Sequence, residues 1–200
     1  MTSKNPNHPC KGARLWADPI RSVADIERVK AHLVGHARNH AIFTVGINTN
    51  LRASDIVKLT VGDVIDLKSG QVFMNREQKT SRYIARAANP AVVAAISRLL
   101  AEHPRRHDLK APLFISQRNC PLTVPTLSRL VKSWCAAAGI GHGKYSSHTL
   151  RKTWAYHALR TFNVPFHLVS AALGHRDHAT TLTYLGIQVE EIVAAFMHEL

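Results

Sequence analysis

His148 and Arg151, in the segment HTLR, lie three residues apart and could therefore bind one group together. On a helix this spacing places both side chains on one face, about one turn from each other. The small polar residues around Lys144 to Ser147, just before the pair, suit a helix cap close to a ligand. Because a His-x-x-Arg pair alone is more typical of an ordinary exposed helix face, its meaning depends on the rest of the chain.

The charge of the chain points to a polyanionic partner. Its 200 residues include 26 Lys and Arg against 13 Asp and Glu, a formal net charge of +13 at pH 7. From Arg105 to Arg176 there are 11 Lys or Arg and a single acid, Asp108, so this stretch carries +10 of the total. General solubility is the alternative explanation, but solvating charge normally mixes both signs. We therefore expect a face that binds phosphates.

Four further segments each carry one residue of interest, which is an arginine, a lysine, a histidine or a tyrosine. They are NTNLRASDIVKLTVGDV with Arg52, KTSRYIAR with Lys79, LGHRDH with His175, and TTLTYLG with Tyr184. Together with HTLR, and in this order, they resemble the tyrosine recombinase or phage-type integrase family over nearly the whole chain. The resemblance implies a catalytic set of Arg52, Lys79, His148, Arg151, His175 and Tyr184. It also implies that the acid three residues after Arg52, Asp55, helps to hold that arginine.

Two guanidinium groups and a tyrosine suit the transfer of a DNA phosphodiester. Attack on phosphorus builds negative charge on the non-bridging oxygens, which Arg52 and Arg151 can hold with paired hydrogen bonds. The hydroxyl of Tyr184, whose type has a pKa of about 10, needs a base or nearby cations to act as nucleophile. His148 is the expected base or proton relay.

The remaining two residues of the set are assigned to the leaving group and the phosphate. Lys79 is expected to protonate the departing sugar oxygen, and His175 to position the phosphate. Because the phosphotyrosine ester retains the bond, a second DNA hydroxyl can reverse the reaction, so no metal, nucleotide or other cofactor is expected.

Two of these assignments have competitors in the sequence. Three other tyrosines could each be the nucleophile while Tyr184 only packs: Tyr83, Tyr145 and Tyr156. Tyr184 is favoured because it lies nine residues after His175 in a polar, threonine-rich segment. Near Lys79, other cations could bind phosphate in its place: Lys68, Arg76 and Arg82.

A metal site is the alternative use of the histidines. His32, His36 and His40 recur every four residues and would form a stripe on one continuous helix. No Cys or carboxylate nearby completes a ligand set, and Gly35 weakens the helix, so we expect no metal here.

The sequence also indicates the compartment. It has no apolar run of the roughly 18 residues that a membrane span needs, and its start lacks the apolar stretch of a signal peptide. Cys10, Cys120 and Cys135 are widely spaced without a C-x-x-C pair, which favours free thiols. We expect a cytoplasmic, nucleoid-associated protein without a membrane partner.

The elements that must position these residues begin with two helices. Ser22 and Asp25 indicate a capping box, so a helix should run from about Val23. A second helical stretch passes through Ala41 to Ile47.

Arg52 is predicted to lie at a helix-to-helix turn. The helix before it should break at residues 48–50, and Ser54 is expected to cap a short helix after it. Asn50 stands where many family members have Gly, but Asn is the next best residue at positive φ, so the turn should survive.

Residues 63–86 predict a small antiparallel sheet. The segment VIDL, the turn Lys68 to Gly70, then QVFMN and REQKTSRYIAR give alternating strands and turns. Lys79 would lie at or near the second turn.

The rest of the chain is predicted to be mostly helical. Asn89-Pro90 is a typical helix start, and another helix should end before Gly139. Shorter helices are expected from His148, from Pro165, from about Thr180 and from Val189. The fold class is therefore mainly α with a small antiparallel β-sheet (α+β), the tyrosine recombinase catalytic-domain fold by resemblance.

We divide the chain into a polar N-terminal arm, residues 1–20, and a catalytic domain, residues 21–200. Because helices begin by about residue 23, the separate DNA-clamping domain of larger family members is not expected. The chain resembles the small single-domain recombinases, such as those that invert promoter segments, or an excised catalytic domain. Lys152 stands where His is frequent in the family and adds charge near the phosphate.

The resulting prediction is a site-specific DNA recombinase or integrase that acts through a 3′-phosphotyrosine, a linkage implied by the resemblance. A topoisomerase of the single-strand-nicking type uses a similar residue set and is the first alternative. The second is a non-catalytic DNA-binding regulator of the same fold.

The partners are double-stranded DNA and further copies of the chain, with a tetramer implied on DNA. An apolar stripe near the C-terminus is expected to dock into a neighbouring protomer or to pack on its own domain: Val189, Ile192, Val193, Phe196 and Leu200.

Overall fold

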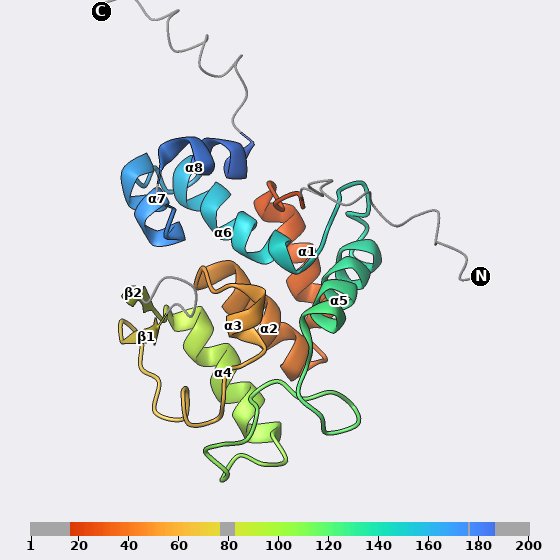
Figure 1. Cartoon of the computed structure of the whole chain (residues 1–200). Helices are drawn as coiled ribbons and strands as arrows, with labels where there is room; N and C mark the ends of the chain where they lie inside the picture. The colour runs from red at the N-terminus through yellow and green to blue at the C-terminus, as the bar shows by residue number, and fades with distance from the viewer. Residues whose placement is uncertain (1–16, 77–82, 176, 187–200) are drawn as a thin grey trace, which may run out of the picture.

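The computed structural model describes residues 17–76, 83–175 and 177–186, which are mostly helical with little strand. The helices are α1 (Val23–Leu33), α2 (Ala37–Asn48), α3 (Ala53–Ile56), α4 (Pro90–Glu102), α5 (Val124–Ala137), α6 (Ser147–Arg160), α7 (Phe166–Leu173) and α8 (His178–Leu185). Figure 1 shows α7 and α8 together at one end, and α6 leading from them to the body that α1 to α5 form.

Two apolar clusters hold these helices. The larger one joins α1 to α6, and its largest fully buried side chains include Phe43, Phe114, Leu127 and Leu150. The smaller one joins α6 to α7 and α8 through Ala155, Ala158, Val169 and Leu173, with Tyr184 packed against it. Helix α6 therefore belongs to both clusters and links the two parts of the molecule.

Helix starts follow the predicted caps in two places. Ser22 accepts a hydrogen bond from the Asp25 amide at the start of α1 (3.3 Å). The Asn89 side chain accepts one from the Val92 amide at the start of α4, with Pro90 as the first helical residue (2.9 Å). Both helices begin where the sequence predicts because one side-chain oxygen satisfies an amide that the helix leaves open.

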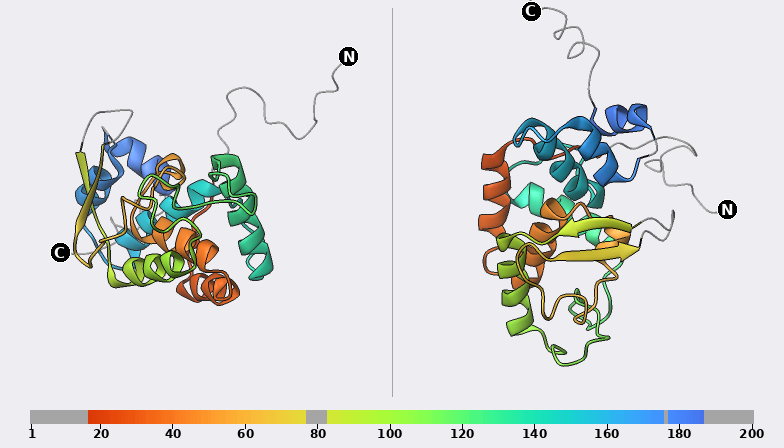
Figure 2. Two further views of the ribbon diagram at one scale, coloured as in Figure 1. Left: turned by 90° about the horizontal axis from the view of Figure 1, so that it is seen from below. Right: turned by 90° about the vertical axis from the view of Figure 1, so that its left-hand side faces the viewer.

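The extended part of the chain is a hairpin. Strands β1 (Val72–Arg76) and β2 (Tyr83–Ala87) pair antiparallel, with Val72 opposite Ala87. The right-hand view of Figure 2 shows them side by side, with α7 and α8 above.

The first strand predicted for this region, VIDL, is wrong. Residues 61–67 form successive turns, because Asp63 accepts hydrogen bonds from both the amide and the hydroxyl of Thr60 (2.8 Å each). Val64 is buried and Leu67 is partly buried, so these apolar residues are three apart, as in a turn, and do not alternate as in a strand.

Helix α6 approaches α2 closely at one glycine. A Cβ on Gly46 would lie 2.6 Å from Leu150 Cδ1 and 2.9 Å from Leu150 Cβ, closer than real Cβ contacts. Leu150 is fully buried and precedes Arg151 in the chain. The missing side chain of Gly46 therefore sets how deeply α6, and with it Arg151, lies against the body.

A short extended segment ties α6 from its other side. The Ile20 amide donates to Thr153 Oγ1 (2.9 Å), and the Ile20 carbonyl lies 2.9 Å from His157 Nε2. Asp18 exchanges two hydrogen bonds with Lys144, from its amide to the Lys144 carbonyl (3.0 Å) and from the Lys144 amide to its carboxylate (2.8 Å).

Among the described residues, none of the helices combines the length and apolarity needed to cross a membrane.

Candidate active site

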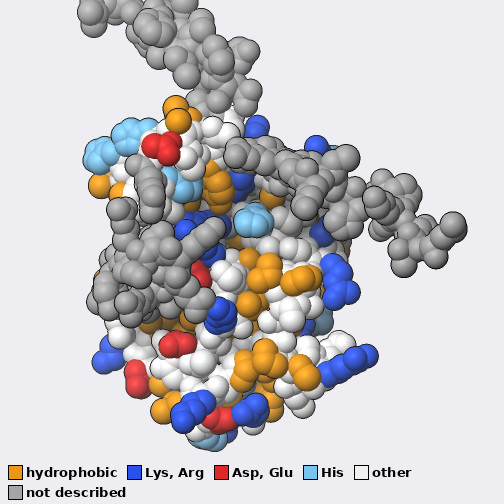
Figure 3. Space-filling model, in the orientation of Figure 1, with side chains coloured by type: hydrophobic (Ala, Val, Ile, Leu, Met, Phe, Trp, Pro, Cys, Tyr) orange, Lys and Arg blue, Asp and Glu red, His pale blue; other side chains and the backbone are white. Residues whose placement is uncertain are grey.

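Five of the six predicted site residues line one open pocket of about 320 Å³. Its walls are Arg52, Ala53, Ser54, Val124, Ser147, His148, Arg151, His175 and Tyr184. Figure 3 shows Lys, Arg and His side chains gathered near the middle of the face below α7 and α8. These residues come from α3, α5, α6, the α7–α8 turn and α8, so only the folded chain brings them together.

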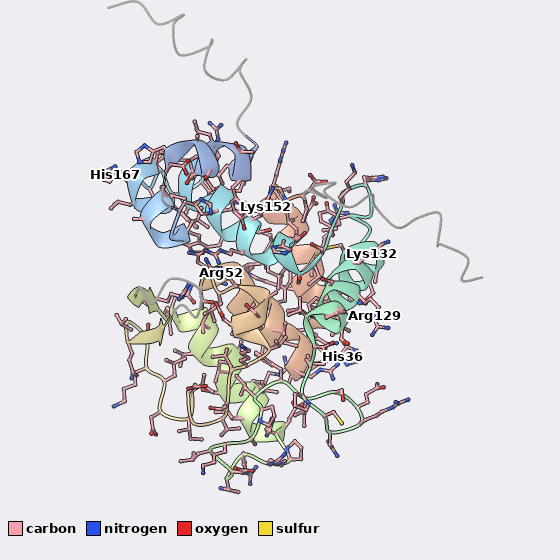
Figure 4. All side chains as sticks on the ribbon, viewed as in Figure 1. His36, Arg52, Arg129, Lys132, Lys152 and His167 are labelled. Carbon is pink, nitrogen blue, oxygen red and sulfur yellow. The ribbon has the colours of Figure 1, made fainter. Side chains whose placement is uncertain are left out.

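Arg52 lies at the turn between α2 and α3, as predicted (Figure 4). Asn50, two residues earlier, has the positive φ of 56° that the sequence predicts, and its side-chain amide donates to the Ala172 carbonyl of α7. The predicted cap is wrong, because α3 begins two residues earlier than a Ser54 cap implies: Arg52 is the N-cap, and its amide donates to the Asp55 carboxylate (3.2 Å). Asp55 therefore holds the backbone of Arg52.

His148 and Arg151 occupy the first turns of α6. Ser128 of α5 holds this end of the helix, since its hydroxyl donates to Ser147 Oγ (2.8 Å) and accepts from the Ser147 amide (3.2 Å). His148 is exposed, whereas Arg151 is buried and donates from Nη2 to the Leu173 carbonyl (2.7 Å). Partial desolvation, together with the charges of Arg151 and Lys152, lowers the pKa of His148 below its usual value of 6.5.

The C-terminal end of α7 binds Arg151 directly and the turn before Arg52 through Asn50. Arg151 donates to the carbonyl of Leu173, and Asn50, next to the Arg52 turn, donates to the carbonyl of Ala172. The last carbonyls of a helix have no partner within the helix and carry partial negative charge, so they suit these donors. Gly174 ends α7 with a φ of 67°, in the left-handed region that glycine favours. This turn places the next residue, His175, in the wall of the pocket.

His175 is fixed by a chain of hydroxyl groups. Its Nδ1 lies 2.9 Å from Thr181 Oγ1, which lies 2.9 Å from Ser170 Oγ. The ring of His175 packs edge to face on the ring of Tyr184, with centroids 5.3 Å apart and planes at 76°. Thr181 is a site residue that the sequence did not indicate, although its place three residues before Tyr184 on one helix face could have done so.

The hydroxyl of Tyr184 is buried and has no hydrogen-bond partner among the described residues. Burial raises the pKa of Tyr184 to about 12, although the nearby guanidinium groups of Arg151 and Arg52 act in the opposite direction. The phenol is therefore neutral at pH 7. Any reaction at its oxygen needs a group that accepts the proton during attack.

The competing residues do not enter this pocket as far as the structure describes them. Tyr145 lines a different hollow, near Gly143, and Tyr156 packs edge to face on His157, at 5.3 Å. The side chains of Lys79 and Tyr83 lie outside the described residues.

The histidine stripe does not form. His32 lies in α1, but α1 ends at Leu33, and His36 is the N-cap of α2, so the helix is interrupted between them. Within residues 17–76, 83–175 and 177–186, no three His, Cys, Asp or Glu side chains cluster as metal ligands would.

Two of the three predicted free thiols lie in the described part of the chain. Cys120 is exposed and Cys135 is buried, and both are free. Burial raises the pKa of Cys135 to about 12.

The pocket brings two arginines, two histidines and a tyrosine together, and comparison with known proteins shows the family of the chain. The model of the Phage integrase family matches residues 23–191, so the chain belongs to this family.

The chain is 32% identical to tyrosine recombinase XerC of Caldanaerobacter subterraneus. The match covers 96% of this chain and 54% of XerC. It is 29% identical to the probable integrase/recombinase YoeC of Bacillus subtilis, over 89% of this chain and 94% of that protein. The chain thus spans about half of XerC and nearly all of YoeC.

Solved structures share the fold. The crystal structure of XerA recombinase superposes with a TM-score of 0.73 at 23% identity, over 92% of this chain and 67% of that one. A post-cleavage complex of XerH with a palindromic difH substrate superposes with a TM-score of 0.67 at 21% identity. The match covers 90% of this chain and 53% of the XerH chain.

Proposed function

We propose that this protein is a site-specific DNA recombinase that breaks and rejoins strands through a covalent 3′-phosphotyrosine at Tyr184. One observation carries the proposal: Arg52, His148, Arg151, His175 and Tyr184 line a single pocket. Membership of the Phage integrase family and likeness to proteins named recombinases support it. DNA is the proposed substrate because the chain carries a net charge of +13 and a protein of related fold, the Tn1549 transposon integrase, is described in complex with a circular intermediate DNA.

In the proposed reaction Tyr184 Oη forms a bond to phosphorus while the bond from phosphorus to the 5′ oxygen of the next nucleotide breaks. Arg52 and Arg151 bind the two non-bridging oxygens, on which charge builds up. His148 accepts the phenolic proton, and its lowered pKa leaves it neutral and able to do so at pH 7. His175, held by Thr181, hydrogen-bonds the phosphate.

Lys79 completes the proposed set as the acid that protonates the departing 5′ oxygen. Strands β1 and β2 flank the segment that contains it, so the hairpin would present Lys79 to bound DNA. A second strand with a free 5′ hydroxyl then attacks the phosphotyrosine and gives its proton to Lys79, which the first step left neutral. The bond from phosphorus to Tyr184 Oη breaks, and the phenolate takes back the proton from His148. The step needs neither metal nor nucleotide, because one ester replaces another.

The proposed unit is the catalytic domain of residues 21–200 behind a polar arm, acting near DNA in the cytoplasm. We propose a tetramer on DNA as the active assembly, as the family resemblance implies.

The test uses the full chain and a pool of duplexes that carry a nick close to randomised cleavage sites, so that the released fragment is lost and the covalent complex accumulates. We expect an adduct that survives denaturing gels, forms equally in EDTA and is absent with Tyr184→Phe, although that variant still binds DNA. An adduct formed by Tyr184→Phe would overturn the assignment, and absence of any adduct would favour a DNA-binding regulator. Relaxation of supercoiled plasmid without a specific site would favour a topoisomerase.

A further inference from the structure

Lys152 is a buried cation that packs directly on the proposed nucleophile. It follows Arg151 in α6, is only 7% exposed, and its Nζ lies 5.0 Å from the centroid of the Tyr184 ring. Figure 4 shows Lys152 on α6, the helix that joins both apolar clusters. The ring of Tyr184 thus has a cation over its face and the edge-to-face contact of His175.

Burial of this charge has a cost that the site must offset. Desolvation lowers the pKa of Lys152, the carboxylate of Asp18 raises it, and the guanidinium of Arg21 lowers it. Replacing a buried charge by an apolar side chain of similar length is often neutral or stabilising, so packing alone does not require a lysine at this position. A cation over an aromatic face, in contrast, is attracted by the ring's electrons, and more strongly in a desolvated place.

We propose that Lys152 is a positioning residue for Tyr184, whose ammonium holds the ring by its face and so keeps Oη in the pocket. The inference rests on the proposed role of Tyr184. As the phenolic proton leaves, electron density moves into the ring, so the contact strengthens from phenol to phenolate. The same gain applies when the phenolate leaves during rejoining. Lys152 itself forms no bond to DNA and transfers no proton.

The test compares Lys152→Met, which keeps the length of the side chain, with Lys152→Arg, which keeps the charge. At saturating DNA we expect Lys152→Met to slow single-turnover cleavage about 10- to 30-fold, while the dissociation constant for DNA stays within about twofold. Lys152→Arg should restore most of the rate. The thermal midpoint of Lys152→Met should be unchanged or higher, because a buried charge is removed. Equal rates for Lys152→Met and the unaltered chain, or no recovery with Lys152→Arg, would overturn the proposal.

A second measurement tests the contact without cleavage. The shift in thermal midpoint caused by Lys152→Met is compared in three backgrounds: Tyr184, Tyr184→Phe and Tyr184→Leu. The first two retain a ring, so their shifts should agree, whereas the Leu background should differ by about 2–4 °C. Equal shifts in all three would contradict the contact. If the unaltered chain forms no adduct but the shifts behave as expected, the proposed function fails while the Lys152 contact stands.

Discussion

Tyr184 is unusual at the scale of single residues because its polar oxygen is buried without a hydrogen-bond partner among the described residues. Such a group costs about 1–3 kcal/mol relative to a bonded one. A hydroxyl that must bond to a phosphate in the reaction cannot also be held tightly by the protein. The cost therefore fits an oxygen that the site keeps ready for an incoming group.

Removing either guanidinium should affect cleavage more than binding. Arg52→Ala and Arg151→Ala should each slow single-turnover cleavage by about 10² to 10³, since each removes one aligned donor to the oxygens that gain charge. Arg151→Lys should recover little, because an ammonium lacks the fork of two parallel donors. Arg118→Ala, which is exposed and outside the pocket, is the matched control.

Circular dichroism should accompany these variants, since Arg151 also donates to the Leu173 carbonyl and its loss can destabilise the fold. If binding and cleavage fall by the same factor in a folded variant, the arginines only anchor the phosphate.

The pH dependence of cleavage should identify the base. At subsaturating DNA the rate reports groups of the free protein, and desolvation with the Arg151 and Lys152 charges holds the pKa of His148 below 6.5. A base works when unprotonated, so the rate should be flat near pH 7 and fall only as the pH drops through a midpoint below 6.5. His148→Gln should lack this limb. A midpoint above 6.5, or an unchanged limb in His148→Gln, would exclude His148 as the base.

At the scale of elements, the close crossing of α2 and α6 should be intolerant of a methyl group. Gly46→Ala would gain up to about 1 kcal/mol of helix propensity, but overpacking against Leu150 costs about 1–3 kcal/mol. Because Leu150 Cβ as well as Cδ1 is in the way, α6 must move, and Arg151 moves with it. We expect the free energy of unfolding in urea to fall by about 1–2 kcal/mol, with slower cleavage.

Gly35→Ala is the control for that variant, since a Cβ there would meet nothing within 4 Å. It should leave stability and cleavage unchanged. A Gly46→Ala protein as stable and active as Gly35→Ala would show that α2 and α6 can accommodate a methyl group at their crossing.

Helices were predictable where a local signal decides them. The Asn89-Pro90 start of α4 and the positive φ of Asn50 follow from side-chain chemistry within a few residues. The VIDL strand failed because Asp63 captures the Thr60 amide, and Ser54 failed as a cap because Asp55 reaches back to Arg52. In both places a carboxylate accepts a hydrogen bond from the amide three residues before it, and this contact decides the local structure instead of the hydrophobic or capping pattern.

Long-range contacts in the site lie beyond such reasoning. The residue types and order indicated Arg52, His148, Arg151, His175 and Tyr184, but not that Arg151 would donate to a carbonyl of α7. The placement of Lys152 over Tyr184, 32 positions away in sequence, also depends on how α6 packs on α8. A sequence pattern records the types of residue, while packing between helices decides which atoms meet.

For the whole molecule, the pocket lies where two apolar clusters meet. Arg52 belongs to the part built on the larger cluster, and Tyr184 packs on the smaller one. Helix α6 contributes to both and carries His148, Arg151 and Lys152. A change in how α7 and α8 sit on the body would therefore alter the distance between Tyr184, the proposed nucleophile, and Arg52.

Truncation after Gln188 tests whether assembly controls that arrangement. The apolar positions from Val189 to Leu200, which lie outside the described residues, are expected to dock into a neighbouring protomer. The truncated protein should be soluble, folded and able to bind DNA, yet fail to form tetramers on it and to exchange strands. If analytical ultracentrifugation of DNA complexes gives the same stoichiometry for truncated and full chains, the segment packs on its own domain.

The most direct test of the account is to identify the residue that carries DNA in the covalent complex. The complex trapped on nicked duplex is digested with nuclease and protease, and the phosphorylated peptide is sequenced by mass spectrometry. We predict a nucleoside 3′-phosphate ester on Tyr184 in a peptide that contains TTLTYLG. An ester on Tyr83, Tyr145 or Tyr156, or a 5′-phosphate linkage, would contradict the proposed mechanism.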